Sequence, residues 1–430
     1  MARPKAKRGS IFSHLYFQVI LGAVVGIIIG FLKPDLGEAL KPLGDGFIKL
    51  IKMLLAPIIF GTIVVGIAKM GNLREIGRVG IKALVYFEVV STLALLIGLV
   101  VVNVLKPGVG MNIDPGTLDT KSLATYTSAA KQHGVGEFFL NIIPSSVIDA
   151  FAQGNMLQVI LFAVLFGLAL AHLPERGKLV VDVIDSVLHG LFGIVRMIMR
   201  LAPIGALGAM AFTVGKYGLG SLTALGWLIA GVYGTSAVFI IAVLGGIAHL
   251  NRIPFWKFLR FIEDEIAVTF ATSSTEAVLP QMMAKLEQLG CAKPVVGLVL
   301  PTGYTFNADG TAIYLSMAAI FVAQATNTHL RLSDQLLILT VLMLTSKGSA
   351  GVAGAGFVTL AATLSSMDKI PVAGLALLLG VDRFINAARA VTNLIGNGIA
   401  TLVIARWEGA LDEKQTLAIL NHQTDGPAND

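Results

Sequence analysis

The stretch Pro301–Tyr314, PTGYTFNADGTAIY, constrains the fold more than any other part of the chain. It lies in an otherwise apolar run from Val295 to Gln324, yet it contains Asp309 and several helix-breaking residues. An aspartate in the middle of a membrane-spanning helix costs about 2.5–3.5 kcal/mol on insertion scales. Irregular backbone at that depth is tolerated only where it faces protein or a water-filled cavity. The stretch therefore predicts a discontinuous helix whose oxygens hold a cation. The alternative is a kinked packing helix with one buried aspartate.

Composition places the chain in a membrane. Its 430 residues are 55% hydrophobic and only 13% charged, whereas soluble domains are about 25% charged. The net charge of +6 does not indicate a nucleic-acid partner, because much of it lies in short loops where it sets membrane orientation. The single cysteine, Cys291, excludes an intramolecular disulfide and is expected to be a small packing residue.

Six apolar runs are interpreted as spans, at about residues 11–32, 46–70, 80–105, 157–172, 179–214 and 221–250, and several of them exceed the ~20 residues needed to cross a membrane. The first run is too long for a signal peptide and lacks a cleavage site. Basic residues cluster after the second, fourth and sixth runs, so the positive-inside rule predicts a cytoplasmic N-terminus with residues 1–10 as a tail. Residues 408–430 are polar and are expected to form a second cytoplasmic tail.

Four further apolar segments, here called arms, are too short to cross a membrane. They form two pairs, and each pair encloses a short polar or glycine-rich stretch, here called a tip. The first pair, Ile262–Ala271 and Val278–Leu289, encloses TSSTE. The second pair, Leu336–Leu344 and Phe357–Leu364, encloses SKGSAGVAGAG. Each pair predicts a re-entrant hairpin followed by a polar span, and the two hairpins enter from opposite sides. Two interrupted segments in corresponding positions indicate a transporter site. We therefore expect an all-α integral membrane protein with eight transmembrane helices, two re-entrant hairpins and inverted repeats.

The last span, about 371–407, carries a polar stripe. Asp382, Asn386, Arg389, Asn393 and Asn397 are spaced to share one helical face. Arg389 lies midway along the span, which for a continuous helix is about 27 Å from either end and too deep to reach water. Its guanidinium fork suits a substrate carboxylate. The alternative is a structural pair with Asp382.

The hairpin tips supply complementary groups. Ser273, Ser274 and Thr275 offer hydroxyls, and half-helix N-termini offer N–H groups to an anion. The glycines of the second tip let the backbone approach a ligand. Glu88, in YFEVVST of the third span, is a further carboxylate in an apolar run that either titrates, joins a cation site or packs in protonated form.

These motifs resemble the dicarboxylate/amino acid:cation symporter family, which includes the glutamate transporters. The matching pieces are SSTEAVLP at 273–280, NADGT at 307–311, GVAGAG at 351–356 and the stripe at 382–397. Within that family the chain is most similar to bacterial aerobic four-carbon-dicarboxylate transporters, on PTGYTFNADGTAIYL, SKGSAGV and VDRF–ARA–TNL–GN.

The resemblance implies a glutamate-transporter-like fold, a homotrimer and an elevator mechanism in a bacterial inner membrane. Residues 11–250 would be mainly scaffold, with spans three and six joining the transport domain, whose core is 251–407. Both termini would be cytoplasmic. The candidate substrate residues are Ser273, Ser274, Thr275, Thr311, Gly351, Val352, Gly354, Asp382, Asn386, Arg389 and Asn393. The candidate cation residues, a possible sodium site, are Gly303, Thr305, Asn307, Asp309, Asn393 and Asn397.

Two departures from the amino-acid carriers bear on the substrate. Asn386 stands where they have the aspartate that pairs with the substrate ammonium, and Asn397 replaces a cation-ligating aspartate. The first favours succinate, fumarate or malate, with acidic amino acids as the alternative. The second leaves open whether the coupling cation is a proton or sodium; no prosthetic cofactor is expected. Other classes are an anion channel and an intramembrane hydrolase using Ser349 and His189, which shows no third catalytic group.

Overall fold

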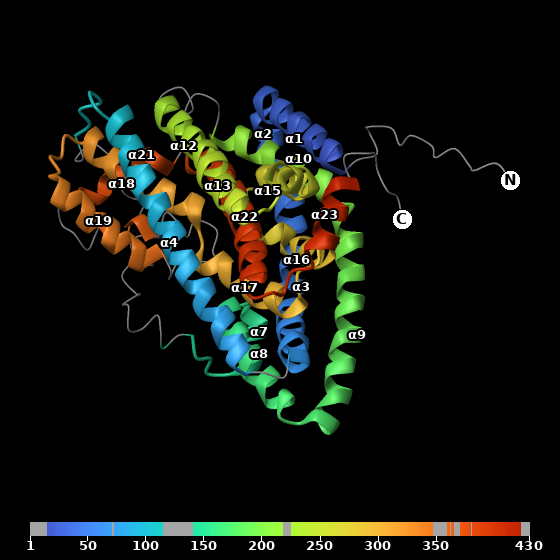
Figure 1. Cartoon of the computed structure of the whole chain (residues 1–430). Helices are drawn as coiled ribbons and strands as arrows, with labels where there is room; N and C mark the ends of the chain where they lie inside the picture. The colour runs from blue at the N-terminus through green and yellow to red at the C-terminus, as the bar shows by residue number, and fades with distance from the viewer. Residues whose placement is uncertain are drawn as a thin grey trace.

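The computed structural model describes residues 15–70, 73–114, 140, 142–217, 225–346, 359–361, 363–364, 370–379 and 381–422. These residues form helices and connecting turns with no β-strand among them; one isolated antiparallel bridge joins Cys291 and Leu411. The predicted all-α architecture is confirmed for this part of the chain. Figure 1 shows the helices running in a few preferred directions around a central red helix, α22.

The first half of the chain forms helices of 6 to 33 residues. They are α1 (Leu15–Leu32), α2 (Pro34–Ala39), α3 (Lys41–Met70), α4 (Leu73–Leu105), α7 (Val147–Gln153), α8 (Met156–Ala171), α9 (Pro174–Met199), α10 (Ala202–Tyr217), α12 (Gly226–Val238) and α13 (Gly245–Leu250). Helix α1 packs along α10, and α3 packs against α8, α9 and α10. A π-helical segment, Phe239–Leu244, joins α12 to α13 without a break.

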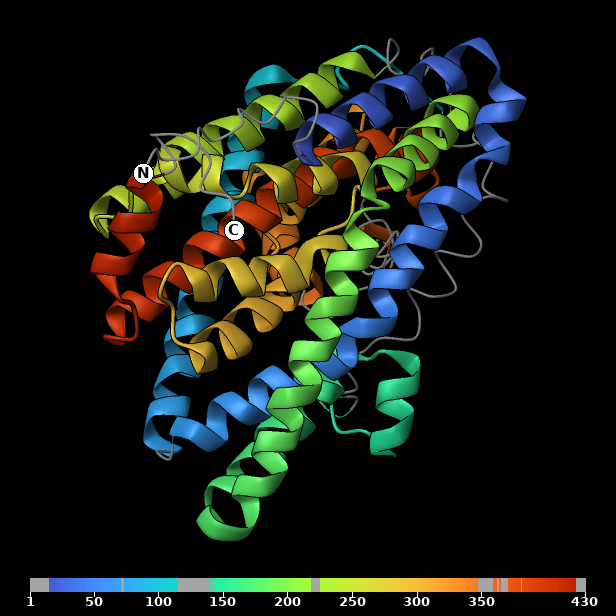
Figure 2. The ribbon, with the colours of Figure 1, turned by 90° about the vertical axis from the view of Figure 1, so that its right-hand side faces the viewer.

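The predicted span at 179–214 is not one continuous helix. The chain forms α9 and α10 there, bent by 54° where they meet. Pro203 lies in the first turn of α10. Its ring would clash with the carbonyl of Met199 if the helix continued, so α9 ends at that residue. Figure 2 shows the long green α9 leaving the body of the molecule while α10 folds back beside α1.

The second half contains shorter helices packed around α22. They are α14 (Phe255–Phe261), α15 (Glu263–Thr272), α16 (Leu279–Gln288), α17 (Lys293–Phe306), α18 (Asp309–Ala325), α19 (Leu332–Thr345), α21 (Ala376–Leu379), α22 (Asp382–Trp407) and α23 (Glu413–His422). Lys285 Nζ lies 2.6 Å from Glu265 Oε2, which ties the end of α16 to the start of α15. The two arms of the first predicted hairpin therefore run antiparallel on either side of the 273–278 turn.

Helix α22 begins later than the sequence suggests. Residues Val372–Leu375 form a 3-10 turn and Ala376–Leu379 a single α-helical turn, and the regular helix starts only at Asp382. The prediction of one continuous helix over 371–407 is therefore wrong. Arg389 lies seven residues into α22, about 10 Å from its start rather than about 27 Å.

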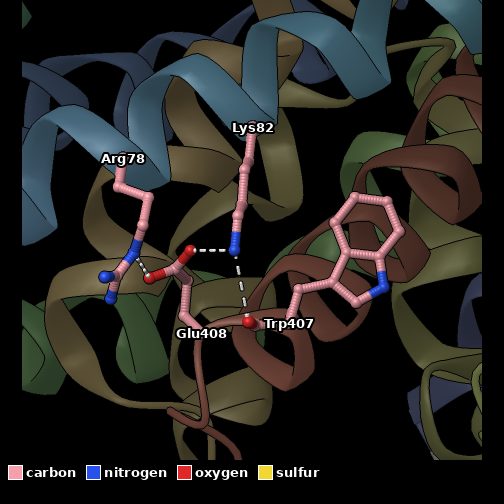
Figure 3. Close-up of polar contacts among 4 residues, drawn as sticks. All are labelled: Arg78, Lys82, Trp407 and Glu408. Carbon is pink, nitrogen blue, oxygen red and sulfur yellow. Dashed lines mark hydrogen bonds and ion pairs between the residues drawn. The ribbon is translucent and has the colours of Figure 1, made fainter.

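The segment after α22 is ordered and ties several helices together. Thr416 Oγ1 donates to Leu289 O at 2.5 Å, and Gln415 Nε2 donates to Gln288 O at 2.8 Å. The carboxylate of Glu408 forms ion pairs with two residues near the start of α4, Arg78 (Nε at 2.7 Å) and Lys82 (Nζ at 2.6 Å) (Figure 3). The predicted tail at 408–430 thus begins as a docked helix that holds the ends of α4, α16 and α22 together.

Cys291 and Glu408 lie just outside the helices and have shifted pKa values. Burial raises the pKa of the Cys291 thiol to about 12, with Glu287 adding to the shift, which agrees with a packing role. Burial also acts to raise the pKa of Glu408, but the hydrogen bonds and charges of Lys82 and Arg78 outweigh it and lower that pKa.

Four helical stretches in the described residues are long and apolar enough to cross a membrane: Gly77–Leu105, Gly226–Leu250, Lys293–Ala325 and Phe384–Trp407. The bent pair α9 and α10 makes a fifth if it is one crossing. Helices α1, α3 and α8 contribute shorter apolar stretches. The chain is therefore a multi-pass helical membrane protein, and the count of eight spans stays a prediction.

Candidate functional site

A helix break lies at the centre of the site, as the sequence predicts. Helix α17 ends at Phe306 and α18 begins at Asp309, with Asn307 and Ala308 in non-helical conformations between them. The side chains of Asn307 and Asp309 are completely buried. The break therefore places a carboxylate and an amide inside the protein, where polar groups need partners.

These two side chains and Asn397 of α22 form a buried polar centre. Asn307 Nδ2 donates to Asp309 Oδ2 at 3.2 Å and to Asn397 Oδ1 at 3.3 Å. Asn397 Nδ2 donates in turn to the backbone oxygen of Asn307 at 3.4 Å and that of Asn393 at 2.8 Å. The Asn307 Oδ1 atom is buried and has no hydrogen-bond partner among the described residues. Carboxylate, amide and carbonyl oxygens are the ligands of hard cations.

Glycines let the backbones approach this centre closely. A Cβ atom added to Gly303 would overlap Asn397 Oδ1, and one added to Gly396 would overlap Asp309 Oδ2. Thr305, a further predicted cation residue, is buried in the last turn of α17. Neither Gly303 nor Gly396 can therefore be replaced by a larger residue unless the polar centre moves.

The sequence analysis missed Ser91 of α4. Its Oγ lies 3.5 Å from both Asp309 Oδ1 and the backbone oxygen of Phe306. Ser91 belongs to YFEVVST, the same motif that contains Glu88. A polar serine within an apolar helix is the sequence feature that could have identified it as a site residue. Glu88 is half-buried, and its backbone oxygen accepts a hydrogen bond from Thr92 Oγ1 at 2.6 Å.

The middle of the polar stripe binds the start of α18. Asn393 Oδ1 accepts the backbone N–H of Gly310 at 2.8 Å, and Asn393 Nδ2 donates to Thr311 Oγ1 at 3.2 Å. Asp309 is the first residue of the same helical turn. Asp309 is therefore next in the chain to Gly310 and Thr311, the two residues that bind Asn393.

Arg389 is buried and only loosely paired. Its side chain is 8% exposed, and Nη1 lies 3.4 Å from Asp382 Oδ1. Its Nε has no hydrogen-bond partner in the described part of the chain. The guanidinium carbon lies 4.5 Å from the centroid of the Tyr314 ring, a cation–π contact that the sequence did not predict. The fork retains donors for a ligand carboxylate.

The tip of the first hairpin lies against the stripe. Asn386 Nδ2 donates to the backbone oxygen of Ser273 at 2.9 Å. Ser273 has a φ of +54°, a left-handed conformation that ends α15. Ser274 and Thr275 follow in the same turn and are half-buried. The structure therefore joins the backbone of Ser273 to the stripe, and the role of the tip's hydroxyls stays a prediction.

Part of the predicted site lies outside the described residues. Gly351, Val352 and Gly354 of the second tip belong to that part, as does Ser349 of the hydrolase interpretation. His189 is exposed, and its Nδ1 lies 2.8 Å from the backbone oxygen of Asp185. It lines a separate cavity of about 260 Å³ with Asp185, Glu287 and Lys293, between α3, α9, α16 and α17.

A membrane protein with a broken helix, a buried carboxylate and a buried arginine beside it has the architecture of a secondary transporter. Residues 15–407 match the sodium:dicarboxylate symporter family, and the chain belongs to that family. A C4-dicarboxylate transport protein from Citrifermentans bemidjiense is 59% identical over 423 residues, covering 98% of this chain and 96% of that protein. Proteins with the same name from Yersinia enterocolitica and Serratia proteamaculans are 57% and 58% identical over 417 and 406 residues. These alignments cover 97% and 94% of this chain, and 97% and 95% of the two relatives.

Proposed function

We propose that this protein carries four-carbon dicarboxylates across a bacterial inner membrane together with a cation. The observation that carries the proposal is the buried Arg389, held by one long contact to Asp382 and by the Tyr314 ring. An arginine fork binds a carboxylate through two parallel hydrogen bonds. The names of the relatives, C4-dicarboxylate transport proteins, support the same substrate class.

The cation binds beside the helix break in this proposal. Asp309, Asn307 and Asn397 supply oxygens there, and Ser91 contributes its hydroxyl from α4. An all-oxygen environment suits sodium, and Asp309 alone could take up a proton. The family description supports sodium. Cation and substrate are coupled through α18, because Asp309 begins the turn whose Gly310 and Thr311 bind Asn393.

Transport follows an elevator mechanism in this proposal. Residues 251–407, with the third and sixth spans, form a moving domain; the rest of 11–250 forms the scaffold of a homotrimer. The protein crosses the membrane eight times, with both termini in the cytoplasm. Cation binding favours closure of the second hairpin on the substrate. A ligand shifts such an equilibrium only through its different affinities for the two states.

Asn386 favours dicarboxylates over acidic amino acids. Its amide donates to Ser273 O and carries no negative charge to pair with an ammonium group. Acidic amino acids are the second candidate substrates, because Arg389 would bind their side-chain carboxylate equally well.

The test is uptake by proteoliposomes that contain the purified protein. We expect accumulation of labelled succinate above the external concentration, driven by a sodium gradient or by a proton gradient imposed separately. The gradient that drives accumulation identifies the coupling ion. Equilibration without accumulation under both gradients would identify a channel and overturn the proposal. Competition by L-aspartate as strong as that by fumarate would favour the amino-acid substrate.

A further inference from the structure

A cavity of about 270 Å³ lies between α4 and α19, and none of its lining residues belongs to the polar centre. Its walls are mainly Leu95 and Leu96 from α4 and Leu336, Leu339 and Met343 from α19. The lining contains no charged side chain. Because the walls are apolar, the cavity suits a hydrocarbon ligand rather than water.

The two threonines in the lining do not change this character. Thr92 Oγ1 donates to the backbone oxygen of Glu88 at 2.6 Å, and Thr340 Oγ1 donates to that of Leu336 at 3.0 Å. Each hydroxyl is thus satisfied within its own helix. A ligand that needs a hydrogen-bond donor would have to break one of these bonds, because each hydroxyl has a single proton to donate.

Polar contacts hold the two helices together at both ends of the cavity. Asn103 Nδ2 donates to Gln335 Oε1 at 2.8 Å, and Thr92 Oγ1 lies 3.2 Å from Met343 Sδ. The two contacts are about 16 Å apart along α4. Helices α4 and α19 therefore run antiparallel, with an apolar gap between two fixed points.

The cavity opens onto an apolar outer surface. Leu96 and Leu336 line the cavity and are also exposed, and Val89, Val100 and Leu337 continue the exposed apolar face on the same two helices. Helix α4 contains one of the stretches long and apolar enough to cross a membrane. In the bilayer this face contacts lipid tails, so the medium at the mouth of the cavity is hydrocarbon.

We propose that this cavity binds one acyl chain of a membrane lipid. An apolar cavity of about 150 Å³ takes up benzene, so this larger one holds a segment of a chain but not a whole lipid. The bound chain wedges between α4 and α19 and limits how closely they approach. The binding does not rest on the proposed transport function.

The test uses the full chain in vesicles of phosphatidylcholine and phosphatidylglycerol. A small fraction of the phosphatidylcholine carries a photoactivatable diazirine in the middle of one acyl chain, and adducts are mapped by peptide mass spectrometry. Leu95 and Leu339 are buried, at 3% and 7% exposure, whereas Val100 and Leu337 are exposed outside the cavity. We expect adducts on Leu95 and Leu339 at least as abundant as those on Val100 and Leu337.

Thr340→Phe fills the cavity, and Leu337→Phe is the matched control on the outer face of α19. We expect Thr340→Phe to lower the Leu95 adducts at least fivefold and Leu337→Phe to leave them unchanged. If Thr340→Phe elutes differently from wild type in size exclusion, Leu96→Phe fills the cavity from α4 instead. Adducts confined to Val100 and Leu337, or Leu95 adducts unaffected by filling, overturn the proposal. The expected adducts in vesicles that take up no succinate would leave the acyl site standing and refute the transport function.

Discussion

The guanidinium carbon of Arg389 lies 4.5 Å from the ring centroid of Tyr314, and both side chains are buried. The ring stabilises the cation on one face, while the only described carboxylate contact, to Asp382, is long at 3.4 Å. Tyr314 comes from α18 and Arg389 from α22, so the contact also fixes how the two polar helices pack. The arginine is held in place without its donors being used up, which is the condition a substrate site requires.

Arg389→Lys is expected to abolish most transport while leaving the protein folded. Lysine keeps the charge but loses the planar fork. Losing one charged hydrogen bond, about 1.5–3 kcal/mol, predicts a loss of roughly 10- to 100-fold in succinate affinity. Arg406→Lys is the matched control, because Arg406 lies on the same helix and bonds Asn251 and Glu413 away from the site. Near wild-type succinate affinity in Arg389→Lys would make Arg389 structural.

Asp309→Asn should weaken the cation dependence of uptake more than the substrate affinity. The amide keeps the shape of the carboxylate but removes the charge next to Asn307 and Ser91. We expect the cation concentration for half-maximal uptake to rise at least tenfold, about 1.4 kcal/mol. Exposed Asp149, which bonds Gln153 on α7, gives the control Asp149→Asn. An unchanged cation dependence would argue against Asp309 as the cation ligand.

Gly396→Ala tests the same centre from α22 without replacing a polar side chain. The added methyl overlaps Asp309 Oδ2, so the carboxylate has to move. We expect a rise of at least tenfold in the cation concentration for half-maximal uptake, with the protein still eluting as wild type. Gly246→Ala is the control, since a Cβ there meets nothing within 4 Å. If both variants behave alike, the close approach at Gly396 does not matter for the cation.

The broken helix and the polar stripe could be predicted because their signals are local. Asp309 in an apolar run and the spacing of the stripe each constrain a single helix. The partners could not be predicted in this way. Ser91 meets Asp309 across 218 residues of sequence, and Asn386 meets Ser273 across 113. Such pairings depend on how helices pack, which the pattern along one helix does not contain.

Helix boundaries were the second feature that the sequence did not predict correctly. A 36-residue apolar run at 179–214 looked like one span, yet Pro203 divides it into two bent helices. Apolar character also hid the short turns before Asp382, so the length of continuous helix before Arg389 was overestimated. Hydropathy reports burial in lipid or protein, and it does not report the direction in which a helix continues.

Glu408→Gln should destabilise the protein near neutral pH but not in acid. The side chain of Glu408 is only 3% exposed, and Lys82 and Arg78 lower its pKa despite the opposing effect of burial (Figure 3). A carboxyl whose pKa is lower in the folded state adds stability above its unfolded pKa of about 4.3 and loses it as the pH falls through the folded pKa. Because both basic partners are at least a third exposed, we expect only about 1 kcal/mol.

Thermal unfolding of the detergent-solubilised protein measures this effect. The melting temperature of Glu408→Gln should lie below wild type at pH 7, and the gap should close as the pH falls below about 4. Glu413→Gln is the control, because Glu413 is 54% exposed in its pair with Arg406. A gap that persists unchanged in acid would show that the carboxylate charge is not the cause.

Asn386→Asp should move selectivity from succinate toward aspartate. Asn386 lies one turn before Arg389 on the same face, next to the first tip. A carboxylate there attracts an ammonium group: two unit charges about 4 Å apart interact by roughly 4 kcal/mol at an effective dielectric near 20. The realised effect is smaller, because the new carboxylate cannot donate a hydrogen bond to Ser273 O and repels that oxygen.

Competition of labelled succinate uptake by unlabelled L-aspartate measures the change directly. We expect the ratio of aspartate to succinate affinity to rise at least tenfold, or about 1.4 kcal/mol. Asn386→Ala separates the two contributions, because it removes the same hydrogen bond to Ser273 without adding charge. If Ala and Asp shift the ratio equally, the tie to the hairpin tip sets selectivity. If neither shifts it in a variant that still transports, Asn386 does not exclude the amine, and the preference for dicarboxylates must originate elsewhere in the site.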